Sequence, residues 1–444
     1  MNIVVAGGGR VGFHVARLLS SENHDVTVIE CDPNRLEFID SALDARCVLG
    51  MSTSVMLLKQ AGVDKTDLFV STTGKDEENL ISAATAKGLG AKQVLARADN
   101  LTYVESNILY ESILGIDYIL SPDALTAMEI AKYVEHPGMV GGEELGRGSV
   151  IMRQVRVDQL PNGTRQSVRD LELPPNVLLG IVNRNGKTTI PKGDTIIEIN
   201  DLVTFVGTPD GVSEAQRIYH GTEPKVESVV IMGGSTIGLR LAQVLERSGR
   251  AVKIIDWDLQ RCKELAASLK KAKVVCADAT SRSTLEQEHI EATDLFVATT
   301  GDDERNIMAS ILAEEVGVKR SVVVVHQPDF APLVARLGID HAVTPRTSFA
   351  NRVVKLVHQK TFSSSAVIEE GQVEILEFSV QTDSPVHGKQ IQGVRFPEKS
   401  LVSMVLRGKD VIVPKGDTHL LVGDSVFVIV TPDAIEAVQK LFKK

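Results

Sequence analysis

Residues 1–30 read MNIVVAGGGRVGFHVARLLSSENHDVTVIE, and this stretch decides the fold. A short apolar strand leads into Gly7-x-Gly9-x-x-Gly12, and these glycines open a helix with a regular apolar stripe. A second apolar strand follows and ends in Glu30. Strand, glycine-rich turn, helix and strand in this order predict a βαβ unit within a parallel sheet.

The spacing of these residues matches the dinucleotide-binding fingerprint. Gly7 is expected to make the tight turn, Gly9 to leave room for a pyrophosphate, and Gly12 to let the helix lie close to the sheet. The helix N-terminus supplies free N–H groups and partial positive charge for phosphates. Glu30, about 20 residues after Gly7, is placed to accept hydrogen bonds from ribose hydroxyls and to repel a 2′-phosphate. The sequence therefore predicts a nucleotide site that disfavours NADP.

The chain contains the same design twice. Three pairs of segments match in the same order: Val4–Gly12 (VVAGGGRVG) with Val230–Gly238 (VIMGGSTIG), Leu68–Gly74 (LFVSTTG) with Leu295–Gly301 (LFVATTG), and Pro191–Thr195 with Pro414–Thr418 (both PKGDT). The sequence is therefore a tandem duplication of a unit of about 220 residues.

The second copy changes one position of the fingerprint. It reads Gly233-x-Ser235-x-x-Gly238, and Asp256 stands where Glu30 stood. Ser235 adds a side chain where backbone has to approach phosphate. Three outcomes are open for this second site: weak binding, binding of a different nucleotide, or no binding.

Two further elements are expected at the same crevice, the carboxyl edge of the parallel strands. Thr-Thr-Gly ends the fourth strand of each copy, and Arg97 ends the fifth strand of the first, where it is placed to neutralise a phosphate. A plain turn and a solvated surface arginine are the alternatives. The candidate nucleotide-binding residues are Gly7, Gly8, Gly9, Arg10, Val11, Gly12, Glu30, Thr73, Gly74 and Arg97 in the first copy, and Gly233, Gly234, Ser235, Thr236, Ile237, Asp256, Thr300 and Gly301 in the second.

Each copy divides into an α/β part and a β-rich part. The first 120 or so residues alternate Val/Ile-rich strands with helical patterns, which is typical of a parallel sheet, and the last 80 or so carry short strands punctuated by Gly, Pro and Asp. Helical segments headed by proline are predicted over Pro122–Tyr133 and Pro345–Val357. The strands predicted in the first copy are 2–6, 25–30, 46–49, 67–72, 93–97 and 116–120. The predicted domains are 1–138, 139–221, 226–360 and 361–444.

Composition excludes several classes of protein. The 444 residues are 43% apolar and 24% charged, which fits a soluble globular protein rather than a disordered chain. A net charge of −10 with 4% aromatics argues against a nucleic-acid binder. No signal peptide and no apolar run of membrane-spanning length is evident. The four cysteines show no metal-binding spacing, so we expect a cytosolic protein whose cysteines are reduced packing residues and which holds no metal.

An enzyme is the main alternative, because this fold commonly carries hydride chemistry. A dehydrogenase needs a general acid or base and a substrate domain, whereas each α/β part here is followed only by a small β-rich lobe. None of the ten histidines recurs at an equivalent place in the other copy, and we assign no catalytic residue. A scaffold with vestigial nucleotide sites is the third possibility. Equal thermal shifts with and without NADH, ATP and ADP would favour such a scaffold.

Taken together, these motifs resemble the RCK family, the regulators of potassium conductance, and most closely its tandem members, the Trk-type potassium uptake regulatory subunits. The resemblance covers the whole chain. It rests on the first glycine motif with Glu30, the proline-headed crossover helices, the two β-rich lobes, and a repeated Thr-Thr-Gly followed by Asp-Glu-x-Asn. The residues of that repeat are Asp76, Glu77 and Asn79 in the first copy and Asp303, Glu304 and Asn306 in the second.

The resemblance implies a function. RCK-type Rossmann-like lobes bind NAD(H) or adenine nucleotides such as ATP and ADP, and the smaller lobes are RCK C-terminal domains. Four two-unit chains, a homotetramer, would form a ring on the cytoplasmic face of the inner membrane, touching the membrane only through a channel subunit of the TrkH kind. Nucleotide exchange would change the ring's shape and the channel's gating. After the third strand the family often has Gly-Asp-Ala-Thr, whereas the first copy reads Met51-Ser52-Thr53, which leaves its contacts there open.

Overall fold

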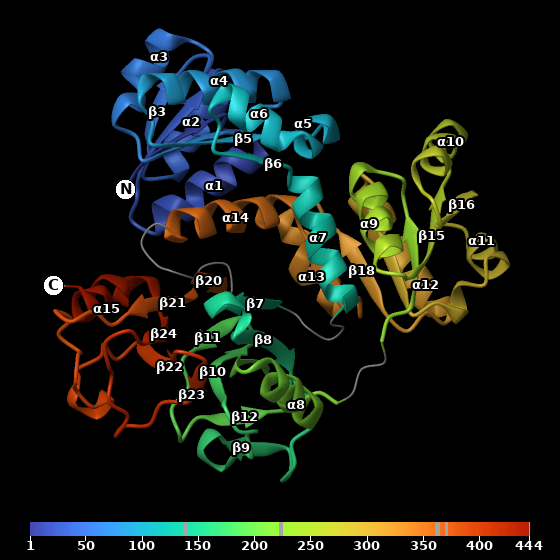
Figure 1. The fold of residues 1–444 in the computed structure, drawn as a ribbon. Helices are drawn as coiled ribbons and strands as arrows, with labels where there is room; N and C mark the ends of the chain where they lie inside the picture. Colours follow the sequence, from blue (N-terminus) through green and yellow to red (C-terminus); the bar gives the residue numbers. More distant parts are fainter. Residues whose placement is uncertain (136–140, 222–224, 360–364, 369–371, 444) are drawn as a thin grey trace. The chain divides into compact units, whose positions relative to one another are not determined.

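The computed structural model describes residues 1–135, 141–221, 225–359, 365–368 and 372–443. The chain forms two compact units, and each is built from both copies (Figure 1). Unit 1 comprises Met1–Glu135 and Lys225–Val354, and unit 2 comprises His136–Pro224 and Lys355–Lys444. The domain limits predicted at 138/139 and 360/361 lie outside the described residues.

The first half of unit 1 is a six-stranded, wholly parallel sheet in the order β3-β2-β1-β4-β5-β6. The order reverses between β1 and β4, so a crevice opens at the carboxyl ends of these two strands, where ligands bind in such sheets. The strands are β1 Asn2–Ala6, β2 Asp25–Glu30, β3 Arg46–Leu49, β4 Leu68–Ser71, β5 Gln93–Arg97 and β6 Tyr118–Leu120. The helices are α1 Arg10–Ser21, α2 Pro33–Ala42, α3 Val55–Gln60, α4 Asp76–Leu89, α5 Leu101–Glu105, α6 Asn107–Leu114 and α7 Pro122–Glu135.

The second half repeats this topology in the order β16-β15-β14-β17-β18-β19, again wholly parallel. The prediction of two tandem Rossmann-like domains is therefore confirmed. The strands are β14 Ser228–Met232, β15 Ala251–Asp256, β16 Lys273–Cys276, β17 Leu295–Ala298, β18 Ser321–Val324 and β19 His341–Val343. The helices are α9 Thr236–Arg247, α10 Leu259–Ser268, α11 Arg282–Gln287, α12 Asp303–Val316, α13 Ala331–Arg336 and α14 Pro345–Gln359.

Two predicted strands are shorter in the structure. The strand predicted over 67–72 ends at Ser71, because Thr72 turns its hydroxyl back to the carbonyl oxygens of Ala6 and Gly7 at 3.1 and 3.0 Å. The strand predicted over 116–120 begins only at Tyr118. Both proline-headed helices run two residues further than predicted, to Glu135 and Gln359.

The first crossover helix, α7, packs on the second half of unit 1. Its buried residues Ile130 and Val134 share one hydrophobic core with Leu241 and Leu245 of α9 and with the second sheet. Figure 1 shows α7 lying directly beside α9. The two Rossmann-like halves are therefore joined by a helix that belongs in sequence to one half and in packing to the other.

The two β-rich lobes of unit 2 have one topology. Their antiparallel sheets have the orders β11-β10-β13-β8-β7 and β23-β22-β24-β21-β20, which match strand for strand. Side chains of both lobes, among them Val150, Ile181, Phe427 and Ile429, form a single core. The first lobe comprises β7 Gly141–Leu145, β8 Val150–Arg156, β9 Arg165–Ser167, β10 Val177–Arg184, β11 Lys187–Thr189, β12 Ile196–Glu198, β13 Leu202–Gly207 and α8 Pro209–Tyr219. The second comprises β20 Ser365–Ile368, β21 Val373–Ser379, β22 Ser400–Arg407, β23 Asp410–Ile412, β24 Ser425–Val430 and α15 Ile435–Phe442.

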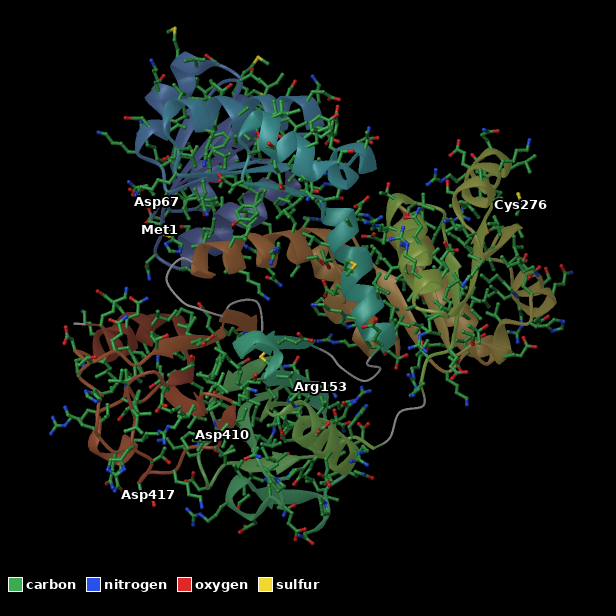
Figure 2. All side chains as sticks on the ribbon, in the orientation of Figure 1. Met1, Asp67, Arg153, Cys276, Asp410 and Asp417 are labelled. Carbon is green, nitrogen blue, oxygen red and sulfur yellow. The ribbon has the colours of Figure 1, made fainter. Side chains whose placement is uncertain are left out.

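The repeated Pro-Lys-Gly-Asp-Thr segments are surface turns. The Thr195 hydroxyl accepts a hydrogen bond from the Lys192 N–H at 2.9 Å, and Thr418 closes the second turn in the same way on Lys415. The lysine and aspartate of each turn are exposed, and Figure 2 shows Asp417 at the edge of its lobe. The turn geometry thus explains the threonine of the motif. Among the described residues, no helix is both long and apolar enough to cross a bilayer.

Candidate nucleotide site

The glycine-rich loop of the first half is shaped by close backbone contacts. Gly7 has a φ of +95°, and a Cβ there would lie 2.8 Å from the Thr73 nitrogen. A Cβ on Gly12 would lie 1.8 Å from the Gly7 carbonyl oxygen, so this position tolerates only glycine. Gly9 faces open space, because a Cβ added there would lie 4.0 Å from its nearest neighbour, a guanidinium nitrogen of Arg35. The loop therefore closes at its ends and is open in the middle.

The N-terminus of α1 is uncapped. Its N-cap residue is Gly9, and no side chain accepts from the N–H groups of the first turn. Unpaired N–H groups and the helix dipole together form an anion-binding site. The loop thus presents donors toward the open side of Gly9.

Glu30 ends β2 beside this loop and is buried. Its Oε2 accepts from the Gly8 N–H at 2.7 Å, and its Oε1 accepts from the N–H groups of Cys31 and Asp32 at 2.8 and 3.0 Å. Burial alone would raise the pKa of Glu30, but the hydrogen bonds from Asp32 and Gly8, followed by those from Cys31, outweigh it and lower the pKa. The carboxylate is therefore held ionised and in a fixed orientation at the crevice.

A buried asparagine positions the strand ends that face the loop. The Asn79 Oδ1 accepts from the Thr73 N–H at 2.7 Å, and its Nδ2 donates to the Thr73 and Arg97 carbonyl oxygens, both at 3.1 Å. Asn306 makes the same bonds to Thr300 and Val324 in the second half. The asparagine of the repeated Asp-Glu-x-Asn thus ties the end of one central strand to the next.

Two neighbouring cavities of about 500 and 710 Å³ lie at this crevice. They share the lining residues Gly9, Arg35, Thr72 and Gly74. The smaller one is lined further by Gly7, Ile29, Glu30, Cys31, Gly50, Met51, Ser52, Thr53, Thr73, Lys75 and Glu78. It therefore includes the predicted residues Glu30, Thr73 and Gly74, and also the segment Met51-Ser52-Thr53 that departs from the family pattern.

The larger cavity is basic. Arg10, Arg35, Arg97 and Arg346 line it together with His326. Burial, and then the nearby charge of Arg10, lower the pKa of Arg346. Mutual repulsion of this kind is relieved when an anion binds. The crevice therefore has the fixed Glu30 carboxylate at one end, with Arg35 at 3.8 Å from it, and has Arg10, Arg97 and Arg346 together with Asp123 at the other.

The predicted Arg97 lies at this cationic end. Its guanidinium binds the Asp99 carboxylate through two hydrogen bonds of 3.0 and 2.6 Å, which orients it. Arg10 and Val11 also line the cavity, whereas Gly12 lies against the Gly7 carbonyl. The structure thus brings the first-copy candidates together around one crevice.

The second half has the same loop with its centre filled. The Ser235 hydroxyl donates to the Thr299 carbonyl at 2.6 Å and accepts from the Gly238 N–H at 3.2 Å, so it caps α9. Asp256 accepts from the Gly234 N–H at 2.6 Å, which matches the bond of Glu30, and the Arg261 guanidinium donates to the Gly234 carbonyl at 2.6 Å. Ser235 therefore accepts a hydrogen bond from an N–H group at the start of α9, whereas no side chain caps the start of α1 in the first half.

Sequence reasoning missed several lining residues of the crevice, among them Arg35, His326 and Arg346. Arg35 lies in the first turn of α2, while His326 and Arg346 come from the other half of the chain. The Arg346 guanidinium donates to the His326 carbonyl, so the two form one segment of the wall. The signal available for Arg346 was its place beside Pro345, at the start of a helix.

Two known domain families match the chain, each of them twice. The TrkA-N domain family matches residues 3–122 and 229–345, and the TrkA-C domain family matches residues 163–220 and 375–443. A Trk system potassium uptake protein TrkA homolog from Archaeoglobus fulgidus is 33% identical over 443 residues, covering 100% of both chains.

Solved structures show the same fold. The GsuK channel bound to NAD matches with a TM-score of 0.62 and 18% identity, covering 99% of this chain and 78% of that one. GsuK bound to ADP matches with a TM-score of 0.52 and 15% identity, covering 81% and 69%. Both domain families occur twice, in the alternating order predicted from the repeat, and the full-length relative is a potassium uptake protein. The chain therefore belongs to the TrkA family of Trk system potassium uptake proteins, and not to a family of dehydrogenases.

Proposed function

We propose that this chain is a cytoplasmic regulatory subunit of a Trk-type potassium uptake channel and that it binds an adenine nucleotide, NAD(H) or ATP/ADP, in the first Rossmann-like half. The observation that carries this proposal is the polarity of the first crevice. A fixed carboxylate, Glu30, lies at one end, and the arginines Arg10, Arg97 and Arg346 lie at the other. A nucleotide has the matching polarity, because its ribose hydroxyls donate and its phosphates carry negative charge.

The same crevice supports nucleotide-dependent regulation. Arg346 heads α14 of the second half, yet it lines the cavity beside the loop of the first half. A longer phosphate chain would reach further toward Arg346 and draw the two halves together. A ligand shifts a conformational equilibrium only if it binds the two states with different affinity, and phosphates shared between halves meet that condition.

The second site is proposed to be the weaker one. Ser235 satisfies the Gly238 N–H and the Thr299 carbonyl, and Arg261 covers the Gly234 carbonyl. Phosphates entering this loop would have to break these bonds, which costs about 0.5–1.5 kcal/mol for each.

A homotetrameric ring beneath a TrkH-like membrane subunit is the proposed assembly. Equivalent faces of the two halves expose apolar side chains in the described part of the chain: Ile81, Ile108 and Ile113 on α4 and α6, and Met308 on α12, Leu333 on α13 and Leu337 directly after α13. Exposed apolar faces of this kind are typical of protein interfaces. Native mass spectrometry should give four 48.0 kDa chains, and Ile113→Asp should dissociate them. Met56→Asp, at an exposed position on α3, is the control and should leave the assembly intact.

Identification of the bound nucleotide tests the binding proposal. Nucleotide released by denaturing the purified protein should be identified by mass spectrometry, and calorimetry should compare NADH, ATP and ADP. Gly9→Asp places a carboxylate in the open loop and should abolish binding. The matched variant Ser235→Asp, in the second half, should leave nucleotide binding in the first half unchanged. Equal loss in both variants would contradict the assignment to the first half.

Potassium flux tests the regulatory role. Proteoliposomes containing a TrkH-type channel should respond differently to the wild-type protein with ATP and with ADP, and Gly9→Asp should remove that difference. Identical fluxes with the two nucleotides and with none would contradict the proposal.

A further inference from the structure

From the sequence, all four cysteines are expected to be packing residues. Two of the four are exposed, so this expectation is wrong for them. Cys31 and Cys276 are exposed, and each lies at or just beyond the end of a strand. Cys262, on α10, is buried, and Cys276 is the last residue of β16 (Figure 2). These last two cysteines approach one another at the carboxyl end of β15, on the edge of the second sheet that corresponds to the crevice of the first half and is called the second crevice below.

Both thiols lie against the same corner of β15. The Cys262 Sγ donates to the Asp256 carbonyl oxygen at 3.3 Å, and the Cys276 Sγ lies 4.0 Å from the carbonyl oxygen of the next residue, Trp257. Cys276 is also paired with Asp256 in the sheet register. The Cys262 Sγ is 3.9 Å from the carbonyl oxygen of Val275, the residue before Cys276. The two side chains are therefore neighbours across α10 and β16.

The chemistry of the pair is asymmetric. Burial, and then the adjacent thiol of Cys276, raise the pKa of Cys262 to about 12, so its thiol is protonated at neutral pH. Cys276 is exposed and accessible to a soluble oxidant. The exposed thiol is thus the first to react, and the buried one can only follow it.

The fold itself does not require cysteine at these positions. Leu36 and Leu49 occupy the equivalent places on α2 and at the end of β3 in the first half. The cysteines of that half make other contacts, since Cys31 donates to the Glu30 carboxylate and Cys47 to the Ala45 carbonyl. Within the described residues, no group of three or more His, Cys, Asp or Glu side chains is arranged to hold a metal ion.

We propose that Cys262 and Cys276 form a reversible disulfide at the rim of the second crevice, with a hydroperoxide as the oxidant. The Cys276 sulfur attacks one oxygen of the hydroperoxide ROOH, which breaks the O–O bond, forms a sulfenic acid and releases the alcohol ROH. The Cys262 sulfur then attacks the sulfenic sulfur, and the S–S bond forms as the hydroxyl leaves with the Cys262 proton as water. Two thiols and one hydroperoxide become one disulfide, one alcohol and one water. A dithiol reductant reverses the bond by exchange.

The disulfide would act on the second crevice. It would bind α10 to β16 around the carbonyls of Asp256 and Trp257, and the Asp256 side chain holds the Gly234 N–H of the loop. Closing the chain between residues 262 and 276 also restricts the unfolded state. Oxidation should therefore raise the melting temperature, and reduction should lower it again.

The test uses the full-length protein, first reduced and then treated with hydrogen peroxide in equimolar amount. Titratable thiols should fall from four to two per chain, and peptide mass spectrometry should find Cys262 linked to Cys276. Dithiothreitol should restore four thiols and the lower melting temperature. In Cys262→Ser, a dimedone adduct should accumulate on Cys276, because nothing resolves its sulfenic acid.

The first-half double variant Cys31→Ser, Cys47→Ser is the matched control and should still form the link. Thiol loss without the Cys262–Cys276 peptide, or a link that depends on Cys31 or Cys47, would overturn the proposal. The proposal would also be overturned if the wild-type protein accumulated the dimedone adduct to the same extent as Cys262→Ser.

Discussion

At the scale of single residues, Glu30 holds the loop as well as facing the crevice. It accepts three backbone N–H groups, so Glu30→Ala should lower the free energy of unfolding in addition to weakening nucleotide binding by about 1–3 kcal/mol. Calorimetry and urea unfolding should measure both quantities. Asp256→Ala is the matched change in the second half, and it should cost stability with little effect on the tight site. Unchanged affinity in Glu30→Ala would remove this residue from the site.

Gly12 provides a second test at this scale. A Cβ there would meet the Gly7 carbonyl oxygen at 1.8 Å, which is backbone and cannot rotate away. Gly12→Ala should therefore destabilise the protein by about 1–3 kcal/mol or more, measured by urea unfolding. Gly88→Ala is the control, because Gly88 is in α4 with nothing within 4 Å of its added Cβ. That change should stabilise by about 0.5–1 kcal/mol, and similar losses in both variants would show that the close contact is not the cause.

At the scale of elements, two histidines lie where the halves exchange helices, His14 buried and His341 partly buried. Burial, then Arg17 and Arg346, lower the pKa of His14 on α1 to about 4, and burial lowers the pKa of His341 on β19 to about 4. The His341 ring stacks on Tyr133 of α7 at 5.2 Å. The folded protein therefore holds both rings neutral.

This predicts acid sensitivity. The unfolded histidines take up protons near their ordinary pKa of 6.5, while the folded ones resist until about pH 4, so stability should fall as the pH drops from about 6.5 to 4. Urea midpoints at pH 7 and pH 5 should show the loss, and His341→Phe, which keeps an aromatic ring against Tyr133, should reduce it. His289→Phe is the control, because His289 is exposed. A pH dependence that His341→Phe leaves unchanged would exclude His341 as a cause.

The helices and strands also show which features could be predicted from the sequence and which could not. Alternating strands and helices, the glycine loop and the repeat predicted both parallel sheets and part of the first-copy lining of the crevice, because these features are local. The apolar face of α7, with Ile130 and Val134, has the same periodicity whichever sheet it covers, so its packing on the second half could not be predicted. Arg346 was missed for the same reason, since it meets the first loop only through tertiary structure. The burial of Cys262 beside an exposed Cys276 likewise depends on the packing of α10.

At the scale of the whole molecule, the duplication has produced two glycine loops that differ at their centres. The first loop keeps an open Gly9, and the second places Ser235 there and satisfies its own donor. The second half instead contributes Arg346 to the cavity of the first. One half thus provides the loop and the acid, and the other provides a cation that reaches the same cavity.

We therefore expect Arg346 to contact the phosphates of a bound nucleotide and not its adenosine. Arg346→Ala removes a charge-assisted contact at the cationic end of the crevice and leaves the Glu30 end unchanged, so the affinity for ATP should fall about tenfold while adenosine binds as before. Calorimetry with ATP, ADP and adenosine measures the three affinities on the full-length chain. Asp123→Ala changes the residue at the equivalent position of the first half, which also lines the cavity, and removing a carboxylate there should not weaken ATP binding. If Arg346→Ala weakened adenosine as much as ATP, the arginine would be supporting the fold of the crevice, and the second half would have no direct part in sensing the phosphates.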